Sequence, residues 1–304
     1  MKEIYDLYSE DAANEPKREY LGASVVCKKC ERQNWYNFRQ AYDKPFIGRM
    51  LRLFDTGKRE ELRIVNDLRR TGKYEVDNKT PEGKQHGFSA FGGHYAGSGD
   101  GKIREVGQEE WMLLEVKTHN QKSYDYLIKN KLKKAKPEHY DQMQIYMNEM
   151  DLAQGFYVAV NKNTDEIYKE IIDREEKKGK AYREKALRII TSEDAPNKIS
   201  QTWDGCFDCT YCSYNRECHK LTGYSLPVKS CRTCVNSTPL PDGGWECELK
   251  SKKIEDEVMP VGCEEHFFIP KLVPATLTVA NPSVISYIDG DGKVLLNLKG
   301  EGFK

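Results

Sequence analysis

The sequence contains no long apolar run. Within its 304 residues, no segment approaches the ~20 consecutive apolar residues that a membrane-spanning helix requires. The first twenty residues, MKEIYDLYSEDAANEPKREY, also lack the apolar core of a secretory signal. These two absences exclude a membrane partner and predict a cytoplasmic protein.

The chain also lacks net charge, because Lys and Arg total 48 and Asp and Glu total 48. A protein that coats nucleic acid with its whole surface needs an excess of positive charge. Any nucleic-acid binding must therefore use local basic stretches, of which KNKLKKAK (129–136) is the clearest. That stretch is either a solvated surface run or a phosphate contact. The phosphate-binding motif GxxxxGK[ST] is absent too, so no helicase motor is predicted.

Cysteine, in contrast, is plentiful, with ten residues in two groups. In a reducing compartment, such thiols are more often metal ligands than disulfides. The first group combines an upstream CxxC with four later thiols, and its soft ligands suit either zinc or an iron–sulfur cluster. The second group has the spacing of a small zinc ribbon or knuckle. The first comprises Cys27, Cys30, Cys206, Cys209, Cys212 and Cys218, and the second Cys231, Cys234, Cys247 and Cys263.

The stretch 92–117, GGHYAGSGDGKIREVGQEEWMLLEVK, combines a turn-rich approach with a short apolar run that predicts a buried strand. Glu115 and Lys117 are two positions apart, so they share one face of that strand, and Asp100 can join them from a neighbouring strand. Paired carboxylates suit Mg²⁺ or Mn²⁺, and a lysine can stabilise developing charge. The alternative is three ordinary polar residues, since 32% of the chain is charged.

Two predicted helices flank this stretch. In the helix expected over 46–70, Glu61 shares the apolar face with Val65 and Leu68, where a metal ion or the helix dipole could stabilise its carboxylate. In HYDQMQIYMNEM, Gln142 and Tyr146 are four residues apart and share a face. An amide and a phenol can bind phosphates or bases without adding charge. The adjacent face carries an expected core stripe of Met143, Met147 and Met150.

In this order, the motifs resemble the PD-(D/E)XK nuclease superfamily, and in particular its RecB-like exonuclease branch. The match is D-x14-E-x-K, with Gly99 where the family name has proline, preceded by Gly57-xxx-Glu61 and followed by Gln-xxx-Tyr. The resemblance implies catalytic metal ligation by Asp100, Glu115 and Glu61, assistance by Lys117, and substrate contacts by Gln142 and Tyr146.

The first cysteine group resembles that of iron–sulfur nucleases of the AddB and CRISPR-associated kind. Cys30-Glu-Arg32-x-x-Trp35 and the later Cys-x2-Cys-x5-Cys match their arrangement. The resemblance implies a [4Fe-4S] cluster that staples the two ends of the nuclease domain, ligated by Cys30, Cys209, Cys212 and Cys218. Cys27 and Cys206 are surplus to that pattern, which leaves open a zinc site formed by Cys27, Cys30, Cys206 and Cys209.

The expected fold is α/β (α+β), a restriction-endonuclease-like mixed central sheet flanked by helices. Paired strands are expected within 71–92, a central strand over 155–162 and its edge partner over 166–173. A charged helix over 174–191 should face inward with Ala181, Ala186, Leu187 and Ile190. The expected parts are an arm (1–24), a nuclease domain (25–222), a zinc module (223–270) and a β-hairpin tail (271–304) that turns at Asp289–Gly292.

These expectations lead to two functional hypotheses. The first is a Mg²⁺- or Mn²⁺-dependent DNA exonuclease for recombination, repair or DNA degradation, which the resemblance places in a phage or mobile element. Its partners would be DNA ends and a separate helicase or recombination protein. The second is a non-catalytic nucleic-acid-binding adaptor with an inert nuclease-like core and zinc modules.

Overall fold

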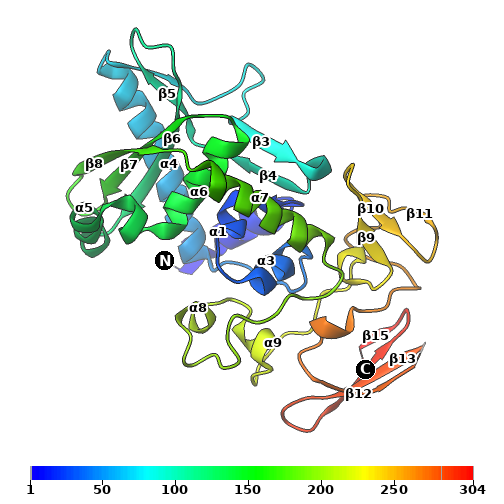
Figure 1. Ribbon diagram of the computed structural model, residues 1–304. Coiled ribbons are helices and arrows are strands. Elements are labelled where there is room, and N and C mark those ends of the chain that lie inside the picture. The colour runs from blue at the N-terminus through cyan, green and yellow to red at the C-terminus, as the bar shows by residue number, and fades with distance from the viewer. Residues whose placement is uncertain (1, 282, 304) are drawn as a thin grey trace.

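A central five-stranded sheet organises the computed structural model, which describes residues 2–281 and 283–303 (Figure 1). Its strand order is β2-β5-β6-β7-β8, and only the β6–β7 pair is parallel. The sheet is therefore mixed, as the sequence predicted. The strands are β2 (Tyr74–Asp77), β5 (Gly101–Glu105), β6 (Met112–His119), β7 (Gln154–Asn161) and β8 (Ile167–Asp173).

The two faces of this sheet are covered by different helices. Successive residues of a strand point to opposite faces, so Leu114 and Val116 of β6 face one side. There they form a core with Ile64 and Val65 of α4 (Gly48–Arg70). The other face, which carries Leu113, lies under α5 (Gln121–Ala135) and α6 (Pro137–Glu149), and α7 (Glu176–Thr191) packs on α6.

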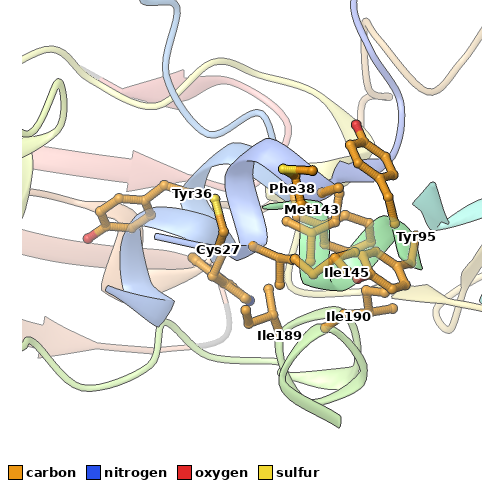
Figure 2. Packing of buried hydrophobic residues seen from close by; sticks show 14 of the residues in the cluster. Cys27, Tyr36, Phe38, Tyr95, Met143, Ile145, Ile189 and Ile190 are labelled. Carbon is orange, nitrogen blue, oxygen red and sulfur yellow. The ribbon is translucent and has the colours of Figure 1, made fainter. Parts of the chain in front are cut away.

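The core on the α6 side of the sheet continues beyond α6, where the segment before α4 meets α7. It contains α2 (Ala23–Val26), α3 (Glu31–Phe38) and a small sheet of order β1-β4-β3. Figure 2 shows its packing, with Phe38 of α3 and Tyr95 of β4 close to Met143 and Ile145 of α6. The three strands are β1 (Leu21–Gly22), β3 (Gly87–Ala90) and β4 (Tyr95–Ser98), and the 3₁₀ turn η1 (Phe91–Gly93) joins the last two.

Two local expectations were wrong. The strands within 71–92 do not pair with each other, because β2 pairs with β5 while β3 pairs with β4 in the small sheet. In α7, Ala181 and Leu187 are exposed, although Ala186 and Ile190 are buried as expected. The buried stripe of α7 starts at Gly179, where a Cβ atom would lie 1.9 Å from Cγ of Asn148 on α6. Close contact at this glycine turns α7 away from the predicted orientation.

The remaining segments surround these cores (Figure 1). α1 (Lys2–Asn14) packs on α4, and a Cβ atom on Gly48 would lie only 1.8 Å from the Tyr5 carbonyl oxygen. After α7 come two short helices and a three-stranded sheet of order β11-β10-β9. These elements are α8 (Phe207–Thr210), α9 (Asn215–His219), η2 (Cys231–Thr233), β9 (Ser237–Pro239), β10 (Trp245–Cys247) and β11 (Lys252–Lys253).

The C-terminal tail forms more structure than the expected hairpin. It is a four-stranded antiparallel sheet of order β12-β13-β14-β15, entered through η3 (Pro270–Leu272). The turn at Asp289–Gly292 is confirmed, since the Asp289 amide donates to the Lys293 carbonyl. Among the described residues, no helix is long and apolar enough to cross a membrane. The strands are β12 (Thr276–Ala280), β13 (Val284–Ile288), β14 (Val294–Leu298) and β15 (Gly302–Phe303).

Candidate active site

Asp100 reaches the centre of the sheet because the β5–β6 ladder stops beside it. The pairing of these two strands ends at Gly101 opposite Leu114. One position further along, Asp100 Oδ2 accepts a hydrogen bond of 2.7 Å from the backbone N–H of Val116. The side chain thus satisfies a strand amide that the ladder leaves without a β5 partner. This bond holds the Asp100 carboxylate next to Glu115.

Lys117 joins the two carboxylates. Glu115 and Lys117 lie on one face of β6, as predicted, and the Lys117 ammonium forms an ion pair with Glu115 Oε1. The same ammonium lies 4.0 Å from Asp100 Oδ2. Burial opposes the charge on Lys117, but the carboxylates of Glu115 and Asp100 raise its pKa. The two carboxylates therefore favour the charged form of Lys117.

Glu115 is the most buried acid of the site, with only 1% of its side chain exposed. Burial raises its pKa, and the Lys117 charge opposes that rise. Within the described residues, its Oε2 accepts no hydrogen bond. A buried carboxylate oxygen without a donor is energetically costly unless a cation compensates it.

Glu61 approaches from α4, which covers the opposite face of the sheet. It lies one turn before Val65 and accepts a hydrogen bond of 3.3 Å from Gln85 Nε2. Burial and the negative charge of Asp100 raise the pKa of Glu61 to about 7, against the opposing charge of Lys117. Three carboxylates, from α4, β6 and the start of β5, thus act electrostatically on one another around a single lysine.

Gln142 and Tyr146 lie on α6 above the face that carries Lys117. Gln142 Nε2 is 3.4 Å from the Tyr146 hydroxyl, which confirms that the two side chains share one face. Burial and the nearby Glu115 carboxylate raise the pKa of Tyr146. Met143 and Met147 are fully buried on the adjacent face, whereas Met150 is only partly buried.

A neutral polar network beneath the site was missed by the sequence analysis. The Tyr157 hydroxyl lies 3.0 Å from His119 Nε2 and 2.9 Å from His139 Nδ1, while His119 Nδ1 is 2.9 Å from Ser123 Oγ. Burial, followed by the charges of neighbouring lysines, lowers the pKa of His119 to about 4 and that of His139 to about 3. A signal was present, because His119 follows Lys117 by two residues and so shares its strand face.

The oxygen donors fit a hard divalent cation. Mg²⁺ is usually held by one or two carboxylates, with water and substrate phosphate completing its octahedron. In the described part of the chain, no group of three or more His, Cys, Asp or Glu side chains is arranged to hold a metal ion as it stands. Asp100 and Glu115 Oε2, which accepts no hydrogen bond within the described residues, are the oxygen donors that could hold such an ion, with Glu61 beside them.

The first cysteine group converges on one cavity between α3 and the α8–α9 segment. Cys30 is the N-terminal cap residue of α3, and the cavity also contains Arg32 and Lys198. Burial raises the pKa of the Cys218 thiol, and these two cations oppose that rise. Cys27 instead lies in the apolar core, where its thiol donates to the Ser24 carbonyl over 3.3 Å (Figure 2). The thiols that line the cavity are Cys30, Cys209, Cys212 and Cys218.

The second cysteine group also gathers around one cavity, within residues 223–270, the segment that contains β9, β10 and β11 and is called the β9–β11 module here. Two of its thiols come from the η2 turn and the following residue, one from the end of β10, and one from the loop after β11. The lining includes His266, which is 1% exposed. The four thiols are Cys231, Cys234, Cys247 and Cys263, the set that the sequence grouped.

Comparison with known proteins gives only distant structural similarity. No protein-family model and no curated protein matches the sequence. The fold is similar to the crystal structure of SSO0001, with 14% identity, a TM-score of 0.42, and coverage of 70% of this chain and 93% of that one. It is also similar to the alkaline exonuclease LHK-Exo from Laribacter hongkongensis, with 14% identity, a TM-score of 0.36, and coverage of 60% and 90%.

LHK-Exo in complex with dAMP matches with 15% identity, a TM-score of 0.36, and coverage of 62% of this chain and 90% of that one. At these identities and TM-scores, a shared function does not follow.

Proposed function

We propose that this protein is a divalent-metal-dependent DNA exonuclease, which hydrolyses phosphodiester bonds in DNA recombination, repair or degradation. One observation carries the proposal: the Lys117 ammonium contacts both Glu115 and Asp100 at the point where the β5–β6 ladder ends. Two acids and a lysine held together in this way provide donors for a hard cation and a fixed positive charge.

The site residues have distinct chemical roles in this proposal. Asp100 and Glu115, with Glu61 beside them, would hold Mg²⁺ or Mn²⁺, which polarises the phosphoryl oxygen and activates a bound water. The Lys117 ammonium, whose pKa is raised by the carboxylates of Glu115 and Asp100, would stabilise the negative charge that develops on the phosphoryl group. Glu115 is shielded from water, which strengthens its interactions with nearby cations.

DNA would approach along α6 and the end of α5. Gln142 and Tyr146 can donate hydrogen bonds to a strand without adding charge. In the basic run 129–136, Lys133 pairs with Glu175 at 2.5 Å and Lys131 lies over the Tyr168 ring. Lys129 and Lys134 are exposed and have no ion pair among the described residues. These two lysines are therefore the phosphate contacts that we expect from this run.

The test is digestion of end-labelled linear DNA in Mn²⁺ or Mg²⁺. Because Asp100→Ala and Lys117→Ala each remove a charge from the site, we expect each to lower the rate by about 10²–10³-fold or more. Glu109→Ala and Lys122→Ala are matched controls, since both residues are exposed and lie outside the site. Activity that survives both site substitutions would contradict the proposal.

The alternative is a non-catalytic DNA-binding adaptor with an inert core. It predicts that the wild-type protein shifts labelled DNA in a binding assay yet leaves it uncut with either ion. The ion-paired Lys117 between two acids favours the nuclease, because an inert core has no requirement for this costly buried arrangement.

We infer in addition that the first cysteine cavity holds a [4Fe-4S] cluster, with zinc as the alternative. Four thiols around one cavity, with Arg32 and Lys198 nearby, suit a group that carries negative charge. Its role would be structural, since it joins α3 to the end of the nuclease domain. Brown, iron-containing protein after anaerobic purification is expected, and colourless protein with zinc alone would favour the alternative.

A further inference from the structure

The β9–β11 module has too little regular structure to be stable alone. Its three strands are only two or three residues long. Sheets of this size need a metal, disulfides or packing against another element. In this chain the module has four free thiols around one cavity and an extensive contact with the nuclease domain.

That contact is a stack of aromatic rings and guanidinium groups. Trp245 of β10 stacks on Phe38 of α3, with ring centroids 5.4 Å apart and planes 25° apart. The guanidinium groups of Arg39 and Arg232 each lie 5.0 Å from the Trp245 ring. Cation–π contacts of this kind gain strength when they are removed from water, and all four residues are buried.

The side chains of the two arginines also donate hydrogen bonds to backbone carbonyl oxygens, and these bonds hold the stack in place. Arg232, in the module, donates to the carbonyl oxygens of Phe38 and Glu19, both at 3.0 Å. Arg39, in the nuclease domain, donates to the carbonyl oxygens of Arg232 at 3.3 Å and Ser237 at 3.0 Å. Each arginine therefore holds the backbone of the other side of the interface.

The residues that make this interface are next to the cysteines in sequence. Arg232 lies between Cys231 and Cys234, and Trp245 precedes Cys247 by two positions. An ion that fixes the thiols therefore also fixes the backbone that carries Arg232 and Trp245.

The turn between β9 and β10 also contacts the β3–β4 hairpin, which precedes Asp100 in the chain. A Cβ atom on Gly92 would lie 2.0 Å from the Gly243 backbone nitrogen, so the two backbones are in direct contact. Gly92 has φ +64 and lies in the turn between β3 and β4, and the chain continues from β4 to Asp100. His94, the residue before β4, meets the Trp245 ring edge-on, with ring centroids 5.9 Å apart.

We propose that Cys231, Cys234, Cys247 and Cys263 bind one Zn²⁺, and that this ion makes the module a clamp on α3 and the β3–β4 hairpin. Four thiolates suit zinc in a closed tetrahedral site, whose binding energy contributes directly to folding. The thiols line the cavity without yet forming a closed ligand set, so zinc would draw them inward. The module is then a structural support of the nuclease domain.

The test measures zinc and unfolding in the full-length protein, neither of which depends on nuclease activity. Cys247→Ser and Cys263→Ser are each expected to lose one equivalent of zinc and several degrees of thermal midpoint, and to show altered Trp fluorescence. Cys212→Ser is the matched control from the other cavity and should keep this zinc. Unchanged zinc content in both Cys247→Ser and Cys263→Ser overturns the metal site.

A second variant separates the ion from the clamp. Trp245→Leu leaves the four thiols in place, so it should keep its zinc while losing thermal stability and becoming sensitive to proteases at 223–270. Trp245→Leu with wild-type stability and protease resistance overturns the clamp. If the cysteine variants do not fold, zinc release from wild-type protein by a thiol-modifying reagent decides the point, because absence of released zinc overturns the site.

Discussion

At the scale of single residues, Glu61 should make stability depend on pH. Its folded-state pKa of about 7 lies above its ordinary value of 4.5, so the folded protein holds this proton more tightly than the unfolded chain. The folded state therefore loses stability as pH rises from 4.5 to 7, and the full penalty is present above pH 7. Without added divalent cation, Glu61→Gln should be more stable than wild type at pH 8 and equal to it near pH 4.5, as measured by thermal unfolding.

Added Mg²⁺ or Mn²⁺ should reverse the effect of the Glu61 carboxylate on folding stability. An ion beside Glu61 compensates the ionised form, so added cation should stabilise wild type more than Glu61→Gln at pH 8. Glu109→Gln, at an exposed position, is the control and should respond as wild type does. Identical pH profiles of wild type and Glu61→Gln would show that Glu61 does not titrate in the way proposed.

Tyr157 is a second residue whose removal should be costly. Tyr157→Phe deletes the hydroxyl that lies between His119 and His139 and leaves a nitrogen of each imidazole without that partner. Unsatisfied buried polar groups cost about 1–3 kcal/mol each. We expect urea denaturation to show a larger loss for Tyr157→Phe than for Ser123→Ala, which removes only the outer contact to His119. Equal losses would contradict the bridging role of the hydroxyl.

At the scale of elements, the spacing between β4 and α6 depends on Gly97. A Cβ atom there would lie 2.7 Å from Tyr146 Cε1 and 3.1 Å from Phe88 Cε1. Gly97→Ala should therefore displace the Tyr146 ring, cost about 1–3 kcal/mol of stability, and lower nuclease activity. Urea denaturation and the DNA digestion assay measure the two effects.

Gly57 of α4 is the matched control for that substitution. A Cβ atom on Gly57 meets nothing within 4 Å, so Gly57→Ala should stabilise the helix by about 0.5–1 kcal/mol. A Gly97→Ala protein as stable and as active as wild type would show that the β4–α6 contact is not critical.

The elements also show which parts of the fold could be predicted. β6 was predictable because its apolar run and the two-residue spacing of Glu115 and Lys117 are local signals. The separate partners of β2 and β3 were not, because strand pairing depends on distant segments that local patterns do not specify. The predicted orientation of α7 was wrong for a related reason, because the buried face includes Gly179, which lies in close contact with Asn148 of α6.

At the scale of the whole molecule, the order of motifs along the chain predicted which residues meet. Asp100, Glu115 and Lys117 come together as the sequence grouped them, and so do the four thiols of the second cysteine group. Four of the six thiols of the first group line one cavity, whereas Cys27 and Cys206 lie outside that lining. The interface of Phe38 and Arg39 with Arg232 and Trp245 was not predictable, because it joins segments about two hundred residues apart. No periodic pattern marks an arginine as the partner of a remote tryptophan.

The first cysteine cavity connects α3 to the α8–α9 segment. A cluster bound there would close a very long loop, and cross-links over loops of that length are worth about 4–5 kcal/mol in the chain-entropy account. Cys30→Ser should therefore lose the metal of this cavity and unfold at markedly lower denaturant concentration than wild type. Cys27→Ser is the matched control, since Cys27 lies in the apolar core and its loss should leave the metal bound. Iron or zinc retained in Cys30→Ser, or lost equally in Cys27→Ser, would mean that the cavity is not the ligand set, and α3 and the α8–α9 segment would then be held by packing alone.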